Sequence, residues 1–259
     1  MQDRYERQVL LSEVGESGQD RLGKSIVAVM GCGGLGTVAS DILVRAGVGN
    51  IRIVDRDRPE LSNLQRQSLY NEVDIVRNLP KAITASEKLN MVNSQTIIEP
   101  IVADINSQNI ESMIDGVDLV IDGTDNLETR FLINDACIKH NIAWAYASVG
   151  GTCGIIKVIV PGETACLRCL LGRMPGMHVH YSKGIWSPVV HMIASLEASE
   201  CLKYLLGKAD ELYNYMIYID VWNGHFEKFL INRRADCPAC AGKEFHYLDE
   251  VCSEMKNRP

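Results

Sequence analysis

The chain has 259 residues, of which 46% are hydrophobic, and a formal net charge of −7 at pH 7 with a pI near 5.4. This acidic balance, with no block of about five basic residues, argues against nucleic acid as a partner. The N-terminal sequence MQDRYERQ is charged, and no apolar run reaches the ~18 residues of a membrane span. We therefore expect a cytoplasmic protein that does not bind a membrane.

The segment over 25–57 contains the first strong motif. An apolar run of strand type leads into GCGGLG, where Gly31, Gly33 and Gly36 have G-x-G-x-x-G spacing. A stretch with helical periodicity follows, and then a second apolar strand that ends at Asp55. Glycines let the backbone approach a phosphate closely, and the helix start supplies N–H groups to the same anion. A Gly-rich turn alone is weak evidence, but together with both strands, the helix and the acidic residue it predicts a nucleotide site.

Two cationic side chains are expected near this loop. Arg66 lies in a polar loop after the second strand, at the sheet edge where α/β proteins bind ligands. It is either a phosphate contact or a solvated loop arginine. Lys81 follows Pro80 at the start of a helix with the sequence KAITASEKLNMVN. A lysine at this position is unfavourable for the helix dipole, so we expect it to face an anion.

Three further strands complete the first half of the chain. They are predicted over 96–102, 118–121 and 143–147. The strand over 118–121 leads into DGTDN, which places Asp122 and Asp125 at the same sheet edge as the Gly-rich loop. Asp125 either caps the helix that follows or binds magnesium beside the nucleotide phosphates.

The second half of the chain has a different pattern. The predicted elements are a strand over 154–160, a mostly apolar helix over 189–206 and a hairpin formed by 215–221 and 226–231. We therefore expect an α/β fold with a doubly wound, mainly parallel, Rossmann-like sheet that antiparallel strands continue.

No change of composition marks a boundary near residue 150, so we expect a single domain over 1–259. Its parts are a solvated N-terminal arm, a nucleotide-binding half and a half with a metal site: 1–24, 25–150 and 151–259. In the arm, Ser17 is predicted to cap a short helix that ends at Leu22.

Two C-x-x-C pairs, Cys166 with Cys169 and Cys237 with Cys240, form the second strong motif. Each pair offers two thiolates to a tetrahedral zinc, and two pairs complete its shell. A redox-active pair would normally occur singly. Four thiolates leave no open position on the metal, so we expect zinc with a structural role and no part in the chemistry.

Together these motifs resemble the ThiF/MoeB/HesA adenylyltransferases, the bacterial relatives of ubiquitin-activating enzymes. The resemblance spans nearly the whole chain. It rests on motifs in the expected order: RYERQ at 4–8, GCGGLG at 31–36, DRD at 55–57, SNLQRQ at 62–67, PK at 80–81, GTDN at 123–126 and both C-x-x-C pairs.

The resemblance implies an enzyme that uses ATP and Mg²⁺ to adenylate the C-terminal carboxylate of a small ubiquitin-like sulfur-carrier protein ending in Gly-Gly, with release of pyrophosphate. It also implies a homodimer in which Arg7 reaches the partner's site, and it places acceptor binding in the second half. The catalytic residues that it implies are Arg66, Lys81, Asp125 and Arg7. The nucleotide-binding residues that it implies are Gly31, Gly33, Gly34, Gly36, Asp55, Asp57, Asn63, Arg66, Lys81, Asp125 and Asn126.

Adenylation suits the chemistry of these residues. A C-terminal carboxylate with a pKa near ~3.5 is already ionised at pH 7, so the reaction needs no general base. The task is to bring carboxylate and triphosphate together and to stabilise charge on the attacked phosphate, which arginine, lysine and magnesium do by electrostatics. We expect Asp55 to hold the ribose hydroxyls, and Lys81 and Arg66 to hold the phosphates.

One loop departs from the family pattern. Many relatives have a cysteine after the first zinc pair that takes the acyl group or its sulfur, whereas this loop has none and His180 occupies the expected position. The histidine is loop filler, a contact to the acceptor or an acyl carrier. We therefore expect no enzyme thioester in this loop. Cys252, in a polar tail, is the one thiol left to test, because the other non-zinc cysteines are predicted in the core or within the phosphate loop.

Two other functions agree with parts of the pattern. A related class of adenylases modifies short precursor peptides, as in microcin-type maturation, and also needs no loop cysteine. The Gly-rich loop alone would permit a nicotinamide-dependent dehydrogenase, but hydride transfer has no need of an anion cage of Arg66, Lys81 and Asp125. We therefore predict carrier-protein activation, with peptide adenylation as the alternative.

Overall fold

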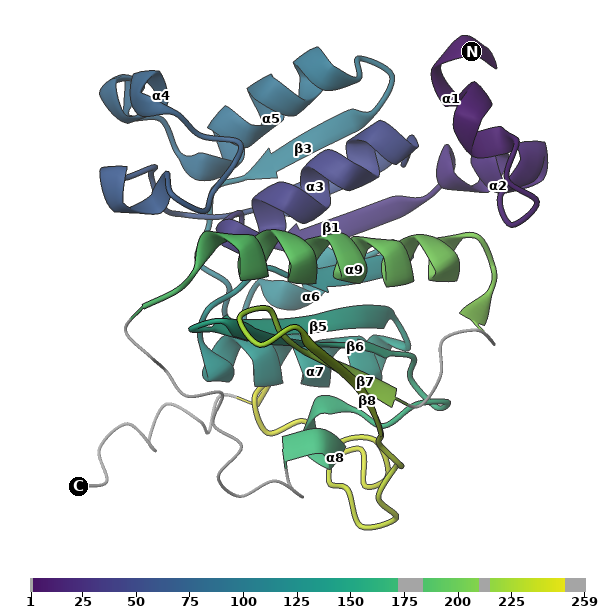
Figure 1. Cartoon of the computed structure of the whole chain (residues 1–259). Coiled ribbons are helices and arrows are strands. Elements are labelled where there is room, and N and C mark those ends of the chain that lie inside the picture. The colour runs from purple at the N-terminus through teal and green to yellow at the C-terminus, as the bar shows by residue number, and fades with distance from the viewer. Residues whose placement is uncertain (1, 172–183, 210–214, 250–259) are drawn as a thin grey trace.

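The structure, a computed structural model, describes residues 2–171, 184–209 and 215–249 (Figure 1). Within these ranges an eight-stranded sheet has the order β3-β2-β1-β4-β5-β6-β7-β8. The strands are β1 (Ile26–Met30), β2 (Asn50–Val54), β3 (Ile97–Ile101), β4 (Leu119–Asp122), β5 (Ala143–Gly150), β6 (Cys153–Ile159), β7 (Tyr215–Asp220) and β8 (His225–Leu230). The helices are α1 (Gln2–Val9), α2 (Gly15–Leu22), α3 (Gly34–Ala46), the 3₁₀ turn η1 (Leu61–Asn63), α4 (Glu72–Arg77), α5 (Lys81–Val92), α6 (Ile110–Ile114), α7 (Leu127–His140), α8 (Leu167–Leu171) and α9 (Ser187–Leu205).

The sheet is parallel in its first part and antiparallel in its second. β1 to β5 pair in parallel, whereas β6, β7 and β8 continue the sheet from β5 as antiparallel strands. The predicted α/β fold with this change of direction is confirmed. β5 extends to Gly150, beyond the predicted end at 147, because its last residues pair with the start of β6.

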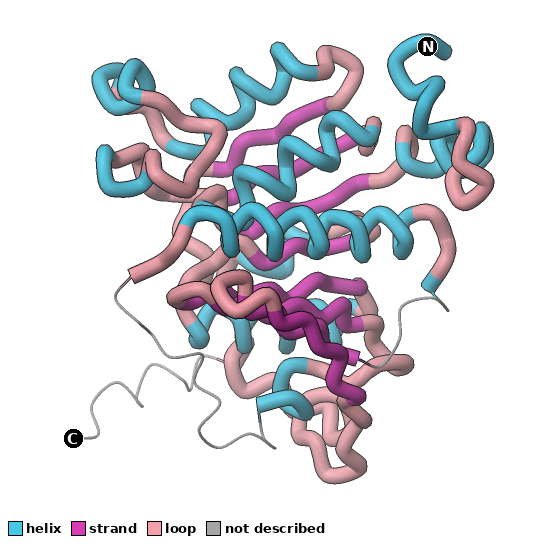
Figure 2. The backbone as a smooth tube through the Cα atoms, in the orientation of Figure 1, coloured by secondary structure: helices cyan, strands magenta, loops and turns pink. Residues whose placement is uncertain are grey.

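Helices cover both faces of the sheet. α3, α5 and α9 pack on one face, and α6 and α7 pack on the other, so the strands lie between two helical layers (Figure 2). Val27 and Val29 of β1 face the first layer, whereas Ala28 and Met30 face the second. Burial on both faces explains the nearly continuous apolar sequence of β1. No helix in the described ranges is long and apolar enough to cross a membrane.

The order of the strands creates a crevice beside the end of β1. The chain runs outward from β1 through β2 to β3 and then returns to β4 on the other side of β1. The connections that leave β1 and β4 therefore diverge in opposite directions. Ligands of α/β sheets bind at such a point, outside the carboxyl ends of the strands.

The helix before β1 does not begin where the sequence predicts. α2 starts at Gly15 with Val14 in the N-cap position, so Ser17 lies inside the helix and its predicted role as a cap is wrong. Gly18 packs closely against Leu206: a Cβ at this position would lie only 2.7 Å from the Leu206 Cδ2 atom. Tertiary packing at this contact therefore outweighs the local preference of serine for a cap.

The first residues of the chain form α1, which packs against the rest of the fold. The prediction of a solvated N-terminal arm is therefore wrong for this segment. Gln8 Nε2 donates a hydrogen bond to the carbonyl of Ala46 at 2.9 Å. The Tyr5 hydroxyl accepts one from Asn93 Nδ2 at 2.8 Å. Ala46 ends α3 and Asn93 follows α5. α1 therefore lies at the amino edge of the parallel strands, beside the C-terminal end of α3 (Figure 1).

Candidate functional site

The turn between β1 and α3 requires glycine at two positions. Gly31 has φ of +93°, and a Cβ there would lie 2.7 Å from the carbonyl oxygen of Gly123. A Cβ at Gly36 would lie 2.0 Å from the carbonyl oxygen of Gly31. The turn is therefore packed backbone to backbone against the loop after β4, which leaves the N-terminus of α3 open to a ligand. Gly123 completes this contact, although its place in GTDN alone did not single it out.

A cleft of about 710 Å³ opens at the carboxyl ends of the parallel strands. It is lined by most of the residues that the sequence assigns to nucleotide binding: Gly31, Gly33, Gly34, Asp55, Asp57, Arg66, Lys81, Asp125 and Asn126. Gly36 packs against the Gly31 carbonyl, and neither Gly36 nor Asn63 belongs to the lining. The fold thus brings together residues from the turn before α3, the loop after β2, the start of α5 and the loop after β4.

Asp55 connects the end of β2 to the phosphate loop. Its Oδ2 accepts a hydrogen bond from the Cys32 backbone N–H at 2.8 Å, and its Oδ1 accepts one from the Asp57 backbone N–H at 2.8 Å. Burial raises the pKa of Asp55, and these two hydrogen bonds oppose that rise. The carboxylate therefore orders the loop in addition to lining the cleft.

Lys81 is held by its backbone beside Asp57. The Lys81 N–H donates to the Asp57 carbonyl at 2.7 Å, and the buried Lys81 Nζ lies 3.7 Å from Asp57 Oδ2. The Tyr70 hydroxyl lies 3.0 Å from the Cys32 carbonyl and 3.3 Å from the Lys81 carbonyl. Tyr70 thereby joins the phosphate loop to the helix that presents the lysine, and no local motif singled it out.

Arg66 lies across the start of α3. A Cβ at Gly34 would lie 3.7 Å from the Arg66 Cγ, so the arginine stem covers the helix start. Its Nη1 donates to the Ser62 carbonyl at 3.1 Å. The Asn63 carbonyl accepts from the Arg66 N–H at 3.0 Å, and its side-chain Oδ1 accepts from the Glu60 N–H at 3.3 Å. Asn63 therefore shapes the loop that carries Arg66 and does not itself face the cleft.

The two carboxylates after β4 have different surroundings. Asp122 is buried, and its Oδ2 accepts from Arg130 Nε at 2.9 Å. Burial raises the pKa of Asp122 and the Arg130 charge opposes that rise. Asp125 is exposed and lines the cleft. The N-cap of α7 is Asn126, whose Oδ1 accepts from the Thr129 N–H at 2.8 Å, so the alternative reading of Asp125 as the cap is wrong.

Arg130 fixes the turn that carries Asp125. Its Nη2 donates to the Thr124 carbonyl at 2.7 Å, and its Nη1 donates to the Ser148 hydroxyl at 3.2 Å. These bonds connect β4, β5 and α7 at the floor of the cleft. Sequence patterns did not reveal this role, because the partners of Arg130 come from two different strands.

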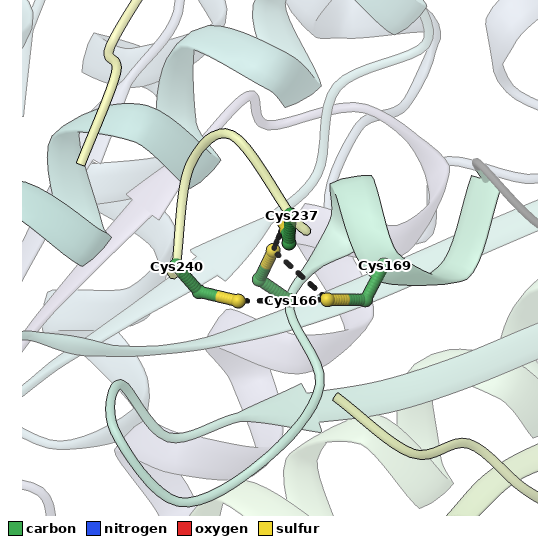
Figure 3. A group of neighbouring side chains, drawn as sticks. All are labelled: Cys166, Cys169, Cys237 and Cys240. Atoms are coloured by element: carbon green, nitrogen blue, oxygen red, sulfur yellow. Dashed lines mark hydrogen bonds between the residues drawn. The ribbon is translucent and has the colours of Figure 1, made fainter. Parts of the chain in front are cut away.

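The four predicted zinc ligands meet in one buried cluster (Figure 3). The Cys166 and Cys237 sulfurs are 3.5 Å apart, as are those of Cys169 and Cys240, and all four lie within 4.8 Å of one another. A tetrahedral zinc with Zn–S bonds of ~2.3 Å needs sulfurs ~3.8 Å apart, so the cluster fits this metal.

The cysteine cluster is attached to the cleft through α8. Cys169 lies in this short helix, and the next two residues, Leu170 and Leu171, line the cleft. The backbone N–H of Arg234 donates to the Cys169 sulfur at 3.3 Å. The cluster therefore anchors one apolar wall of the cleft.

Arg7 also lies outside the lining of the cleft, and two further residues that the sequence analysis named are not among the described residues. Arg7 is exposed on α1, at the amino edge of the strands. α3 separates it from the phosphate loop, and a helix of this length spans ~20 Å. His180 and Cys252 lie outside the described residues.

A glycine loop at the switch point of an α/β sheet, surrounded by lysine, arginine and carboxylates, defines a nucleotide-binding enzyme. Residues 5–239 match the model of the ThiF family. The sulfur carrier protein ThiS adenylyltransferase of Bacillus subtilis is 39% identical over 251 residues, which are 96% of this chain and 74% of that protein. The sulfur carrier protein adenylyltransferase of Thermus thermophilus is 35% identical over 92% of this chain and 90% of its own.

A similar solved structure is Escherichia coli MccB with AMPCPP and MccA, which has a TM-score of 0.78 and 25% identity and covers 92% of this chain and 74% of that one. The chain belongs to the ThiF family. It is an adenylyltransferase, that is, a nucleotidyltransferase that uses ATP. The family resemblance and the class of enzyme predicted from the sequence are confirmed.

Proposed function

We propose that this chain adenylates the C-terminal carboxylate of a small ubiquitin-like sulfur-carrier protein ending in Gly-Gly, with ATP and Mg²⁺ as cosubstrates and pyrophosphate as the product. The observation that carries the proposal is the convergence of the phosphate loop with Lys81, Arg66 and the exposed Asp125 in one cleft. The relatives from B. subtilis and T. thermophilus act on sulfur carrier proteins, which favours this class of acceptor.

The cleft residues act electrostatically, by binding the negatively charged triphosphate and acceptor carboxylate. The acceptor carboxylate arrives ionised, so the cleft needs cations more than a base. Lys81 and Arg66 bind the triphosphate, and the N–H groups at the start of α3 bind its oxygens. Asp55 holds the ribose hydroxyls while it orders the loop. Preorganised cations lower the repulsion between the two anions and stabilise the charge that develops on the attacked phosphate.

Asp125 is the residue that suits Mg²⁺. Its carboxylate is exposed at the cleft beside the phosphate loop, and carboxylate oxygens are ligands that magnesium prefers. When bound, the ion supplies further positive charge to the triphosphate. Asp122 is engaged by Arg130 and Thr124 and does not share this task.

Arg7 completes the cage of a partner subunit in a homodimer. In its own chain it lies at the amino edge of the strands, whereas the cleft lies at the carboxyl edge, so it does not reach its own cleft. Arg7 is exposed, and α1 is fixed to the fold by the hydrogen bond of Gln8, so the arginine is available to a partner subunit's cleft.

Zinc in the four-cysteine cluster holds the second half of the molecule. The cluster has four thiolates and no open position, so the metal stabilises the fold and does not touch the acceptor. By anchoring α8 it keeps Leu170 and Leu171 in the wall along which the acceptor lies.

Activation ends at the acyl-adenylate without an enzyme thioester. Cys32, Cys137 and Cys201 are buried, and burial raises the pKa of each thiol, that of Cys32 to about 12. A thiol in that state is a poor nucleophile at neutral pH. Cys153 is half-buried, which differs from its predicted place in the core, and its sulfur accepts a hydrogen bond from the Tyr218 hydroxyl at 3.2 Å. The acyl-adenylate is then released to an external sulfur donor.

Peptide adenylation is the second candidate, and the likeness to MccB favours it. MccB is a microcin C7 biosynthetic enzyme that has been solved in complex with MccA. The same carboxylate chemistry would act on a short peptide, and the apolar wall of the cleft would accept either acceptor.

ATP–pyrophosphate exchange against a panel of Gly-Gly proteins and short peptides tests the proposal. We expect exchange with at least one Gly-Gly carrier and none with the same carrier lacking its last two glycines. Asp125→Ala abolishes the exchange, whereas Asp115→Ala, an exposed carboxylate outside the cleft, does not. Exchange with a peptide and with none of the carriers would establish the second candidate instead.

A further inference from the structure

Among the described residues, one buried lysine has no hydrogen-bond partner at its ammonium group. Lys157, in β6, is 1% exposed. Its Nζ has no hydrogen-bond partner among the residues that the structure describes. An isolated buried ammonium is strongly unfavourable, and such groups are retained where a compensating charge is present.

The position of Lys157 in β6 identifies that charge. Alternate residues of a strand face the same side, so Lys157 shares its face with Ile155 and Ile159. Both isoleucines belong to the core cluster that contains the four zinc-ligand cysteines, on the α7 side of the sheet. Ile156 belongs to the core on the α9 side. Lys157 therefore lies on the cysteine side of the sheet. Burial lowers the pKa of Lys157 to about 8, and the negative charges of Cys169 and Cys166 oppose that fall.

A loaded cluster has an excess of negative charge. One Zn²⁺ and four thiolates sum to −2 (+2 − 4), and all four cysteines are buried. The Arg234 backbone N–H relieves part of this charge at Cys169, but the Arg234 side chain is paired with Asp236 at 3.0 Å. Lys157 and Arg130 are both buried, but Arg130 is paired with Asp122, whereas the Lys157 Nζ has no hydrogen-bond partner among the described residues.

We propose that the Lys157 ammonium is the counter-charge of the zinc–tetracysteine cluster and favours the form with four thiolates. This inference rests on the proposed zinc site. The inference also concerns the zinc-free chain, in which the same ammonium is buried beside four neutral thiols. Lys157 therefore stabilises the loaded state, destabilises the folded empty state and makes folding of this half depend on the metal.

Zinc competition with the neutral variant Lys157→Met tests the inference. We expect the variant to bind zinc ~10–100-fold more weakly than wild type in titration against a chromogenic chelator, the range found for groups that support metal ligands from the second layer. We also expect the zinc-free variant to melt at the same temperature as the zinc-free wild type, or higher. Lys157→Gln is measured in the same way in case Lys157→Met does not fold.

Glu197→Gln is the matched control. Glu197 is also buried, and its carboxylate oxygens have no hydrogen-bond partner among the described residues, but it lies on α9. Its change should alter the melting temperatures of loaded and empty protein alike and leave the zinc affinity unchanged.

The outcomes separate the two proposals. If wild type binds one zinc and both Lys157 variants bind it as tightly, the lysine is not the counter-charge, although the zinc site stands. If wild type binds no zinc, the zinc proposal fails and this inference fails with it.

Discussion

At the scale of single residues, two carboxylates three positions apart perform different tasks. The Asp122 carboxylate accepts hydrogen bonds from Arg130 and from the Thr124 hydroxyl, the latter at 2.6 Å. Its charge is therefore balanced within the fold. Asp125 follows in the exposed turn and faces the cleft. Both residues are aspartates, so burial and partners distinguish the structural carboxylate from the one that we propose to be catalytic.

Substitution of these two aspartates should have opposite effects. We expect Asp125→Ala to lower pyrophosphate exchange by at least ~100-fold, because a charge-binding group is lost, and to change stability by no more than ~0.5 kcal/mol. Asp122→Ala should cost ~3–5 kcal/mol of unfolding free energy, because it leaves Arg130 buried and unpaired. Exchange assays and chemical denaturation measure both effects. Full activity of Asp125→Ala would remove that residue from the mechanism.

The buried Glu197 should make stability depend on pH. Burial is the main cause that raises its pKa well above the usual value of 4.5; the Asp122 charge also raises it and Arg130 lowers it. Below pH 4.5 the carboxyl is protonated in both the folded and unfolded states. As the pH rises towards the folded pKa only the unfolded state ionises, so stability falls by up to ~1.4 kcal/mol per pH unit.

We therefore expect Glu197→Gln to be more stable than wild type at pH 7.5, with the difference shrinking as the pH approaches 4.5. Denaturation curves at a series of pH values measure this. A difference that does not change with pH would mean that Glu197 is already ionised in the folded protein.

At the scale of secondary-structure elements, α1 and α8 each pack against the fold with some residues and present others to solvent or to the cleft. α1 is tied to Ala46 and Asn93 and presents Arg7 to solvent. α8 carries Cys169 into the cysteine cluster and presents Leu170 and Leu171 to the cleft. Each helix is short, so its position depends on tertiary contacts more than on helix propensity.

Mixing Arg7→Ala chains with Asp125→Ala chains should restore activity that neither variant has. Each mixed dimer has one cleft with Asp125 and the partner's arginine. Half of randomly paired dimers are mixed, so roughly a quarter of wild-type exchange is expected. Subunit exchange is verified with differently tagged chains. A mixture as inactive as both parents would show that Arg7 does not act across the dimer.

Removal of zinc should loosen the second half of the molecule. Structural zinc sites contribute ~10–16 kcal/mol of apparent binding energy in small peptides, which exceeds most of the ~5–15 kcal/mol stability of a domain. We expect one zinc per chain by metal analysis, and a lower melting temperature after Cys169→Ala or chelation. Cys153→Ala, outside the cluster, serves as the control. Absence of zinc from protein purified without chelator would contradict the assignment.

At the scale of the whole molecule, the sheet is continuous between the two halves. β5, from the nucleotide-binding half, pairs from Trp144 to Gly150 with the whole of β6, from the second half. We therefore propose that the chain behaves as a single domain over 1–259. The continuous sheet places the cysteine-anchored wall and the phosphate loop on one cleft.

The complete protein should carry no covalent acceptor after the reaction. Intact-mass measurement under non-reducing conditions, with ATP and a carrier present, is expected to give only the mass of the unmodified chain. An adduct of carrier mass that dithiothreitol removes would contradict this expectation. Its loss in Cys252→Ser would then identify the thiol, and its loss in His180→Ala would identify the histidine.

Features that depend on local chemistry could be predicted from the amino-acid sequence. The phosphate loop was predictable because only glycine permits the positive φ at Gly31 and the close approach at Gly36. The cysteine pairs were predictable because C-x-x-C spacing is set by the geometry of a metal. The buried strands were predictable because burial on both faces demands apolar residues throughout.

The partners of the polar side chains, in contrast, follow from the folded arrangement and have no signal in the sequence. Arg130 bonds to β4 and β5, and Tyr70 joins the phosphate loop to the start of α5, so their contacts depend on segments that the fold brings together. The same is true of Ser17, whose local preference for a cap yielded to packing at Gly18. Lys157 lies within a predicted strand, and its relation to the cysteine cluster follows from its face of β6. Partners far apart in sequence leave no periodic signal, because only the folded chain makes them neighbours.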